Sequence, residues 1–438
     1  MAERLEINRR DMLRTAGLSA LFLFALRPTS RASGGARPNI IFILADDVGA
    51  ESMDMYGGSS WTTPNINSIA EAGMLFENAF SCPCCAPTRA QFLTGRYPFR
   101  TGITYPTLPN GPLSTTGETT VATVLKSGGY STGLAGKWNL RYGSAKGASE
   151  TEQAAHIRAH GFEEHRAFIG HTIQYGPPSP ESDFVPYKLN RWACDFIARK
   201  ALEPKPFYLQ YSLGLVHWPL TATPLDSDST ADDSSDAELY AGMMQYMDDM
   251  VGNVLDVIDT ARIAGNTVVV FGGDNGTWSK IASTYKGMAI QGGKLSAKDT
   301  GSRVPFYVRW PGAVAPGSTY SGLMDFSDIF PTFIEIAEEV VPNHRIIDGK
   351  SFLPQLKGQA GEHREFVFSM DQAAGKLVRD KHWKRLIGDG LYDISNSPFE
   401  EILIPEESQT QEQAKARSRL LGYYEQIIGK ELSDTGDR

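Results

Sequence analysis

Continuous apolar runs that stop abruptly at acidic residues are the feature of this sequence that most constrains its fold. Asn39–Ala45 is apolar after its first residue and stops at Asp46, and Thr267–Phe271 is followed, after two glycines, by Asp274. Runs without polar alternation indicate strands buried on both faces, as in parallel sheets. Parallel strands share their carboxyl edge, and ligands bind outside that edge. We therefore expect the two aspartates to lie close together.

Strand-like and helix-like segments alternate from residue 37 to about residue 360. Further strands are expected at Tyr130–Ala135 and Phe207–Leu213, and helices at Thr63–Ala72, Thr119–Ser127 and Glu238–Arg262. In the last helix the apolar residues recur every three or four positions, which places them on one face. The alternation predicts an α/β fold, with a large, mainly parallel sheet flanked by helices.

Beyond about residue 360 the pattern changes to short strand-like segments. These lie at Phe366–Phe368, Lys376–Val378, Trp383–Ile387 and Leu391–Asp393, and a helix is expected at Gln411–Ile428. Closely spaced short strands favour an antiparallel sheet. We therefore expect a catalytic domain at residues 37–360 and a C-terminal subdomain at residues 361–438, made of a small antiparallel sheet and a helix.

The first 36 residues have the pattern of an export signal. Arg9 and Arg10 precede an apolar run of 11 residues, Ala16–Leu26, and small residues follow up to Ala36. This run is shorter than the ~20 residues of a membrane-spanning helix, and the paired arginines resemble a twin-arginine signal. We expect residues 1–36 to be a signal peptide read by the twin-arginine translocase, and the protein to be periplasmic or secreted, without stable membrane insertion.

The composition excludes two classes of protein. The formal net charge of −9 disfavours a protein that holds nucleic acid through its charge. Four cysteines in 438 residues are too few for a scaffold built on disulfides.

The segment from Cys85 to Arg96 reads C-x-P-T-R-x4-T-G-R. It resembles the signature of the type I sulfatases, in the alkaline phosphatase superfamily, whose cysteine is oxidised to formylglycine. Only Cys85 has the required proline two positions later and arginine four positions later. Cys82, Cys84 and Cys194 are better interpreted as structural cysteines. The resemblance implies a formylglycine-generating enzyme as a partner during maturation.

Other landmarks of the same family follow in order. They are Arg37–Asp47, Gly129–Trp138, Lys205–Pro219, Asp274–Gly276, Gly293–Pro305, Phe330–Thr332, Asp348-Gly349 and Leu391–Asp393. The resemblance covers roughly residues 37–400. It implies an alkaline phosphatase-like fold and the hydrolysis of sulfate monoesters, with a sulfated small molecule or glycan as the substrate.

The resemblance also implies a metal site. Its ligands would be Asp46, Asp47, Asp274, the amide oxygen of Asn275 and the modified residue 85. These are hard oxygen donors, which favour Ca²⁺ or Mg²⁺ over Zn²⁺, and the resemblance indicates Ca²⁺. In isolation, the pair Asp46-Asp47 would equally suit a turn or a helix cap.

Hydrolysis of a sulfate ester needs a nucleophile, cations around the sulfate oxygens and a proton for the leaving oxygen. The resemblance assigns the nucleophile to the hydrated aldehyde at position 85. Lys137, Lys294 and Arg89 would hold the sulfate and stabilise its charge. His217 would protonate the leaving alcohol, alone or with Lys294, although a lone histidine in a loop is more often a surface residue.

Asn139 departs from the family pattern. Relatives usually carry a histidine at this position, where it is thought to take the proton that releases sulfate from the hydrate. An amide donates and accepts hydrogen bonds but is not a base at neutral pH. We expect Asn139 to contact the substrate, with Lys137 or another neighbour as the base, or with a slower release step.

Two alternatives to a sulfatase stay open at this point. One is a phosphodiester or phosphonate-ester hydrolase on the same fold, because sulfate and phosphate share shape and charge. The other is a sulfated-glycan binding protein that has lost turnover, which Asn139 suggests and the complete signature opposes.

Two other clusters resemble metal sites. His156, His160, His165 and His171 do not keep to one helix face, so we expect surface or substrate-rim residues. The acidic, serine-rich stretch Asp226–Glu238 lacks the spacing of a calcium loop, so we expect it to be solvated.

Overall fold

The computed structural model describes residues 37–434, apart from 106–110, 142–148, 169–172, 227–233 and 362. The expected signal peptide, His171 and most of the acidic stretch before Glu238 lie outside the described residues. None of the described helices is both long enough and apolar enough to cross a membrane.

A nine-stranded sheet forms the centre of the fold, with β1 (Asn39–Ala45) in its interior. β5 (Phe207–Ser212) and β6 (Thr267–Gly273) flank β1, and both run parallel to it. All three strands are buried along their whole length, as the apolar runs of β1 and β6 predict; in β5 the burial includes the polar residues Gln210 and Ser212. The strand order is β11-β2-β10-β6-β1-β5-β3-β4, with β9 paired to β2. The remaining strands are β2 (Met74–Phe80), β3 (Ser131–Lys137), β4 (Glu164–Phe168), β9 (Arg303–Val304), β10 (Phe306–Arg309) and β11 (Ser318–Asp325).

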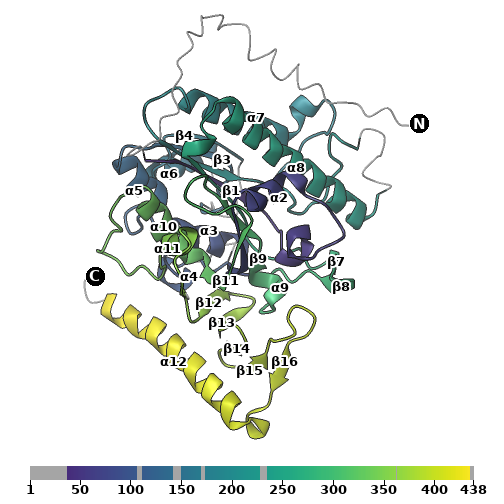
Figure 1. Ribbon diagram of the computed structural model, residues 1–438, viewed down its shortest axis with the longest axis vertical. Coiled ribbons are helices and arrows are strands. Elements are labelled where there is room, and N and C mark those ends of the chain that lie inside the picture. Colours follow the sequence, from purple (N-terminus) through teal and green to yellow (C-terminus); the bar gives the residue numbers. More distant parts are fainter. Residues whose placement is uncertain are drawn as a thin grey trace, which may run out of the picture. The chain divides into compact units, whose positions relative to one another are not determined.

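Helices cover both faces of this sheet, which confirms the predicted α/β fold (Figure 1). Alternate side chains of β1 enter two different cores: Ile41 and Ile43 face one, and Ile40 and Phe42 face the other. The first core includes α2 (Pro64–Glu71), α7 (Val185–Lys200) and α8 (Asp236–Thr260). The second includes α3 (Cys85–Thr94), α5 (Val121–Ser127) and α10 (Ile329–Ile336). The sheet is mainly parallel, since only β9 and β10 pair with their neighbours in antiparallel fashion.

The helix predicted at Glu238–Arg262 is α8, and it begins two residues earlier than expected. Ser235 caps it by accepting a hydrogen bond from the Glu238 backbone N–H, while the Glu238 carboxylate accepts from the Ser235 N–H. Glu238 is therefore the third residue of the helix and not its first. Its predicted apolar face, including Met243 and Met250, is buried.

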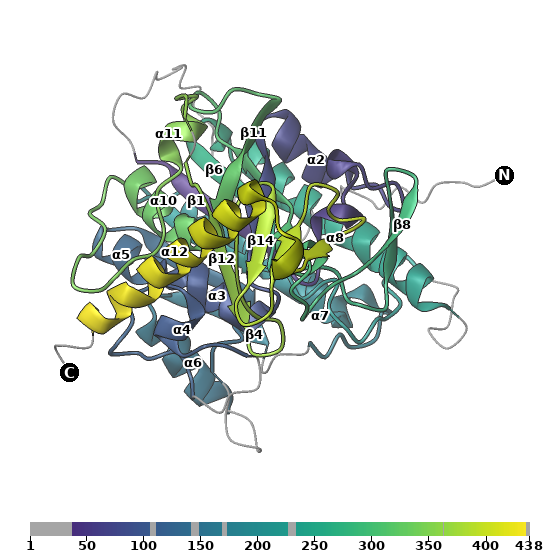
Figure 2. The same ribbon diagram turned by 90° about the horizontal axis from the view of Figure 1, so that it is seen from below.

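The chain after residue 366 forms the predicted antiparallel sheet. Its strands, in spatial order, are β12 (Val367–Asp371), β13 (Gly375–Arg379), β14 (Trp383–Leu386), β15 (Leu391–Asp393) and β16 (Ile402–Ile404). α12 (Gln411–Asp434) crosses this sheet (Figure 2), and its Leu420 and Ile427 pack against Phe368 and Val378. β16 was not predicted, because three exposed or half-exposed apolar residues give no alternation.

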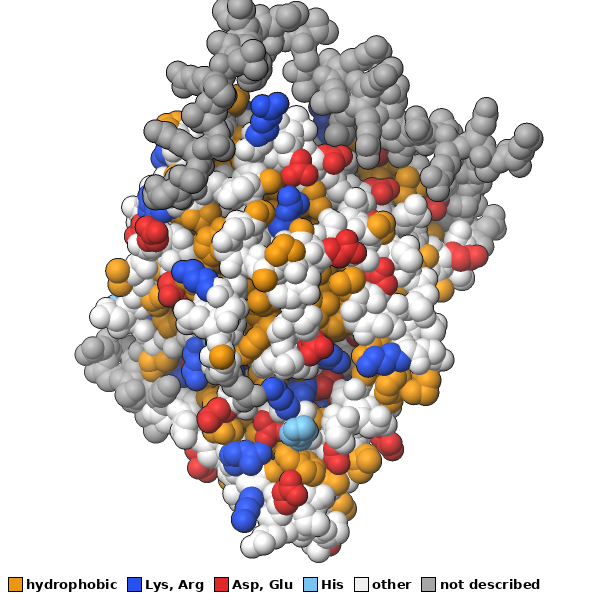
Figure 3. All heavy atoms as spheres, viewed as in Figure 1, with side chains coloured by type: hydrophobic (Ala, Val, Ile, Leu, Met, Phe, Trp, Pro, Cys, Tyr) orange, Lys and Arg blue, Asp and Glu red, His pale blue; other side chains and the backbone are white. Residues whose placement is uncertain are grey.

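Buried polar contacts tie the small sheet to the large one. Arg364, just before β12, donates from Nε to both carboxylate oxygens of Asp328 at 2.7 and 2.9 Å. Ser369 in β12 donates to the Ser81 carbonyl at 2.9 Å. On the face shown in Figure 3, acidic and basic side chains of the described residues are interspersed.

Candidate active site

The predicted site residues meet at the carboxyl edge of the large sheet. Asp46 and Asp47 follow β1, Lys137 ends β3, and Asp274 follows β6. Backbone hydrogen bonds hold this edge together: the N–H of Asp274 donates to the Ala45 carbonyl at 2.9 Å. The Asp47 N–H donates to Asp274 Oδ1 at 3.2 Å. Residues more than 200 positions apart therefore share one site, as the strand pattern predicts.

Each of the three carboxylates pairs with a cation. Lys137 Nζ lies 2.6 Å from Asp46 Oδ2, and Lys294 Nζ lies 2.6 Å from Asp47 Oδ1. Arg89 reaches Asp274 Oδ2 from two of its nitrogens, at 2.7 and 3.1 Å. Buried charges are tolerated only in such pairs.

Arg89 is closely tied to the protein itself. Besides its contacts with Asp274, it donates to the Lys137 carbonyl at 3.0 Å, and its side chain is fully buried. The same guanidinium lies among the charged groups of the site, and the sulfate contact expected from the sequence stays a prediction. Arg89 orients Asp274 and the end of β3.

Cys85 is the first residue of α3, and every residue of this helix is buried. Thr88 closes the first turn by donating to the Cys84 carbonyl at 3.0 Å. Gly95 ends the helix with a left-handed backbone (φ 70°), a conformation that glycine adopts without strain. Residue 85 therefore lies at a helix N-terminus, where an anion is favoured.

The electrostatics of the site favour negative charge at residue 85. A hydrogen bond from the Cys84 side chain lowers the pKa of Cys85 well below its ordinary value; burial opposes this shift, and Lys137 and Lys294 add to it. Burial would raise the pKa of Asp46, but Lys137 and His217 outweigh it and hold that pKa far below normal.

The pKa of Asp274 shifts in the opposite direction to that of Asp46. Burial and the neighbouring charge of Asp46 raise its pKa well above the ordinary value, although Arg89 opposes them. Three carboxylates crowded in a buried space repel one another, and an additional cation between them would relieve this repulsion.

Asn139 lies beside residue 85. Its Nδ2 donates to Cys85 Sγ at 3.0 Å, and its Oδ1 is buried without a hydrogen-bond partner. The backbone of Asn139 has φ 60°, and that of Asp47 has φ 65°. Such strained conformations in residues other than glycine gather at functional sites.

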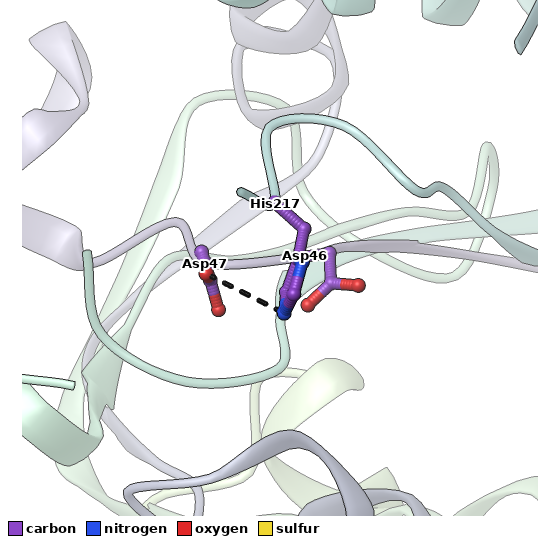
Figure 4. A group of neighbouring side chains, drawn as sticks. All are labelled: Asp46, Asp47 and His217. Carbon is purple, nitrogen blue, oxygen red and sulfur yellow. Dashed lines mark ion pairs between the residues drawn. The ribbon is translucent and has the colours of Figure 1, made fainter. Parts of the chain in front are cut away.

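His217 lies in the loop after β5 and faces Asp47 (Figure 4). Its Nδ1–H donates to the Trp218 carbonyl at 2.5 Å, so Nε2 points toward Asp47 Oδ2, 4.0 Å away. Burial and then Lys137 lower the pKa of His217, while Asp47 and Asp46 oppose them. A lone histidine in a loop is more often a surface residue, but His217 is buried.

The donor atoms fit a divalent cation. Asp46 Oδ1 and Asn275 Oδ1 are buried and lack hydrogen-bond partners. Asn275 Nδ2 donates to Asp47 Oδ1 at 2.8 Å, which leaves its oxygen for another partner. One ligand atom from each of Asp46, Cys85 and Asp274 lies within 4.8 Å of the others. Buried oxygens without partners, beside three carboxylates, match the chemistry of a hard metal ion.

The expectation that the histidines lie at the surface is wrong for two of them. His156 and His160 are buried, and His156 Nδ1 accepts a hydrogen bond from the Trp138 indole at 2.9 Å. Burial, aided by His160, lowers the pKa of His156 to about 4. They support the tryptophan between Lys137 and Asn139 and belong to neither of the candidate metal groups in the described chain.

Asp371, at the end of β12, was not singled out from the sequence. It is buried, its Oδ2 has no hydrogen-bond partner, and burial raises its pKa, with the charge of Cys85 adding to the shift. The tertiary structure brings Asp371 near the cysteine segment. No sequence motif in the small sheet identifies it as a site residue.

Comparisons with known proteins agree with this geometry. The Sulfatase family model matches residues 38–339. N-acetylgalactosamine-6-sulfatase from Sus scrofa is 30% identical over 374 residues, covering 76% of this chain and 68% of the relative. The crystal structure of Ps i-CgsB is 26% identical, with a TM-score of 0.75 over 89% of this chain and 92% of the other. Ps i-CgsB in complex with k-i-k-neocarrahexaose matches with a TM-score of 0.74, at 25% identity over 89% and 92% of the two chains.

Proposed function

The chain belongs to the sulfatase family and is a sulfuric ester hydrolase, and we propose that it releases sulfate from a sulfated carbohydrate through formylglycine formed at Cys85. One observation carries this proposal. The cysteine of the family signature lies at a buried helix N-terminus, beside Lys137, Lys294 and three carboxylates.

Residue 85 is the nucleophile in this proposal. The hydrated aldehyde supplies one hydroxyl that attacks sulfur and a second whose proton loss lets sulfate depart and restores the aldehyde. Cys85 Sγ stands in for the attacking oxygen, and Asn139 Nδ2, 3.0 Å away, donates a hydrogen bond at this position. The lowered pKa of Cys85 reflects surroundings that would equally favour an oxyanion there.

Lys137 and Lys294 hold the sulfate oxygens and balance the charge that develops on them. Lys294 lies in a loop that is fixed to the segment after β6, because the backbone N–H of Lys294 donates to the Thr277 carbonyl at 3.1 Å. His217 would give the leaving oxygen its proton from Nε2. Its Nδ1–H already donates to the Trp218 carbonyl, so this step uses the imidazolium form, which the charges of Asp47 and Asp46 favour and burial opposes. Arg89 would help to hold the sulfate, as the family resemblance implies, and its contacts with Asp274 also position that carboxylate.

The metal ligands would be Asp46, Asp47, Asp274, Asn275 and residue 85. The ion would be Ca²⁺, with Mg²⁺ as the alternative; when bound it would neutralise sulfate charge and lower the pKa of the attacking hydroxyl. The all-oxygen donor set of the four neighbouring residues supports this choice.

The names of the relatives support a carbohydrate substrate. One relative is an N-acetylgalactosamine-6-sulfatase, and one structural neighbour was crystallised with a neocarrahexaose. We also propose that residues 1–36 direct export of the folded protein through the twin-arginine translocase to the periplasm or beyond. A formylglycine-generating enzyme would act before export. Residues 37–360 would form the catalytic domain and residues 361–438 the C-terminal subdomain.

Co-expression with a formylglycine-generating enzyme tests the chemistry directly. The peptide spanning Cys85 should have the mass of the aldehyde, and the purified protein should release sulfate from sulfated oligosaccharides. The Cys85→Ala variant should show neither the aldehyde mass nor sulfate release. A clear preference for aryl phosphodiesters or phosphonate esters over sulfates would favour the first alternative function, and glycan binding without sulfate release would favour the second.

A further inference from the structure

The buried site opens to solvent on one side. The side chains of Asp46, Asp47, Lys137, Arg89 and Asp274 are 0% exposed. His217 and Lys294 are 10% and 12% exposed. A sulfate held among the buried charges must therefore connect to the rest of its substrate past His217 and Lys294.

Two tryptophans flank this opening. Trp218 follows His217 directly and is 51% exposed, whereas the other six tryptophans, all among the described residues, are buried or half-buried. Trp278 comes from the loop after β6, and its ring centroid lies 6.4 Å from that of Trp218. The rings are inclined at 45° and form one aromatic pair.

Hydrogen bonds fix the backbone of both tryptophans to the site. The Trp218 carbonyl accepts from His217 Nδ1, and the Trp278 carbonyl accepts from the Ile281 N–H at 2.9 Å. Thr277, beside Trp278, accepts the backbone N–H of Lys294. The pair is thus anchored next to both the proposed proton donor and the proposed sulfate-binding lysine.

We propose that Trp218 and Trp278 form a platform on which the sugar ring bearing the scissile sulfate stacks. This proposal rests on the proposed function. An indole supplies a large, rigid apolar surface at low cost in side-chain entropy, and a pyranose offers a matching face of C–H groups. Single exposed apolar residues need no explanation, but two aromatic rings that lie together beside a polar site form a patch of the kind that marks a binding surface. The platform selects for a carbohydrate leaving group, while the buried charges select for sulfate.

The test uses the matured full-length protein and a sulfated oligosaccharide that the wild type hydrolyses. Trp218→Ala should raise KM about tenfold, as expected for a truncated aromatic anchor, and Trp218→Phe should recover part of the loss. Inhibition by inorganic sulfate, which occupies only the sulfate pocket, should not change. Trp278→Ala should raise KM in the same way.

Leu202→Ala is the matched control. Leu202 is 88% exposed and lies between α7 and the amino end of β5, at the opposite edge of the sheet, so its truncation should leave KM unchanged. If KM is unchanged in both tryptophan variants, the platform is wrong. It is also wrong if sulfate inhibition weakens in parallel with KM, or if Trp218→Ala dissociates an oligomer without raising KM. Failure of the wild type to hydrolyse any sulfated sugar would instead refute the proposed function.

Discussion

At the scale of single residues, the pair Lys137–Asp46 is completely buried, with Nζ 2.6 Å from Oδ2. Removing both charges from water is costly, and breaking such a pair leaves one charge without compensation. A pair of this kind is weak evidence for stability but suits a site that must hold another anion. The presence of this pair is therefore explained by the chemistry of the site and not by a gain in folding stability.

Lys137→Met should abolish sulfate release and lower the free energy of unfolding by about 3–5 kcal/mol, because Asp46 loses its closest cation and the next, Arg89, is 3.7 Å away. Denaturant unfolding of the variant measures the second effect. In the exposed pair Lys188–Asp183, Lys188→Met should cost less than about 1 kcal/mol. Equal losses in the two variants would contradict this account.

Asn139→His should accelerate turnover. The new imidazole would lie where Asn139 Nδ2 is now 3.0 Å from Cys85 Sγ, and histidine tolerates the backbone at φ 60°. Since a positioned base contributes roughly 10²-fold or more to a proton transfer that limits the rate, we expect kcat to rise at least about tenfold. Asn139→Gln, which keeps the amide, should show no increase.

Aldehyde content must match between these variants, as judged from the peptide spanning residue 85. A kcat for Asn139→His at or below that of the wild type would mean that sulfate release does not limit turnover or that another group already serves as the base.

The ligands after β1 and β6 could be predicted because unbroken apolar runs mark strands whose ends meet. Other residues could not. His156 appears in the sequence as one polar residue among several, and only its hydrogen bond to the Trp138 indole shows that it is structural. Asp371 ends β12, and the contact of this strand with the cysteine segment, from Ser369 to the Ser81 carbonyl, joins residues 288 positions apart, which no local pattern reveals.

At the scale of elements, the strands with full burial were the most predictable. The bounds of β1 agree with the sequence to the residue, because its apolar run ends in charge at one side and Pro38 precedes it. β16 could not be predicted because its side chains are exposed or half-buried and leave no apolar alternation in the sequence. It is defined by its backbone pairing with β15.

The junction between the two sheets depends on Arg364 and Asp328, both buried. Burial would raise the pKa of Asp328, but Arg364 and a hydrogen bond from His363 hold it far below normal. Arg364→Met should lower the free energy of unfolding by about 3–5 kcal/mol and loosen the small sheet. Hydrogen exchange of β12 and β13 measures the second effect.

Arg419→Ala is the control for this junction. Arg419 pairs with Asp380 at the surface, with its side chain 46% exposed, so its loss should cost at most about 1 kcal/mol. If Arg364→Met left β12 as protected as in the wild type, the pair would not be what joins the sheets.

At the scale of the whole molecule, Glu51 gives stability a pH dependence. It lies in a short 3₁₀ helix, Ala50–Ser52, where its Oε1 has no hydrogen-bond partner. Burial raises its pKa from 4.5 to about 7, with a hydrogen bond from Thr277 opposing. Between these values the folded state binds the proton that the unfolded state has lost. The free energy of unfolding therefore falls as pH rises toward 7 and is constant above it.

Glu51→Gln should remove this loss, which corresponds to roughly 3 kcal/mol. The variant should be more stable than the wild type at pH 8 but not at pH 4, as measured by denaturant unfolding at both. Glu71→Gln, at an exposed position on α2, should follow the wild type at both pH values. A Glu51→Gln variant with the same pH profile as the wild type would refute the assignment.

Metal removal should also affect the entire protein. An ion that binds only the folded state at a hundred times its Kd adds about 2.7 kcal/mol to the free energy of unfolding. Chelation should therefore lower the Tm, and added Ca²⁺ should restore it. Asp46→Asn should abolish the response, and a Tm indifferent to chelation in the wild type would exclude a bound ion.

The complete burial of α3 has a consequence for the order of events in the cell. If residue 85 is oxidised as proposed, the oxidising enzyme would need access to the chain around the thiol, and residues 81–94 are all buried in the folded protein. On that proposal, conversion would have to precede folding. A molecule that folded first would keep its thiol, and the active fraction of a preparation would then depend on the relative rates of folding and oxidation.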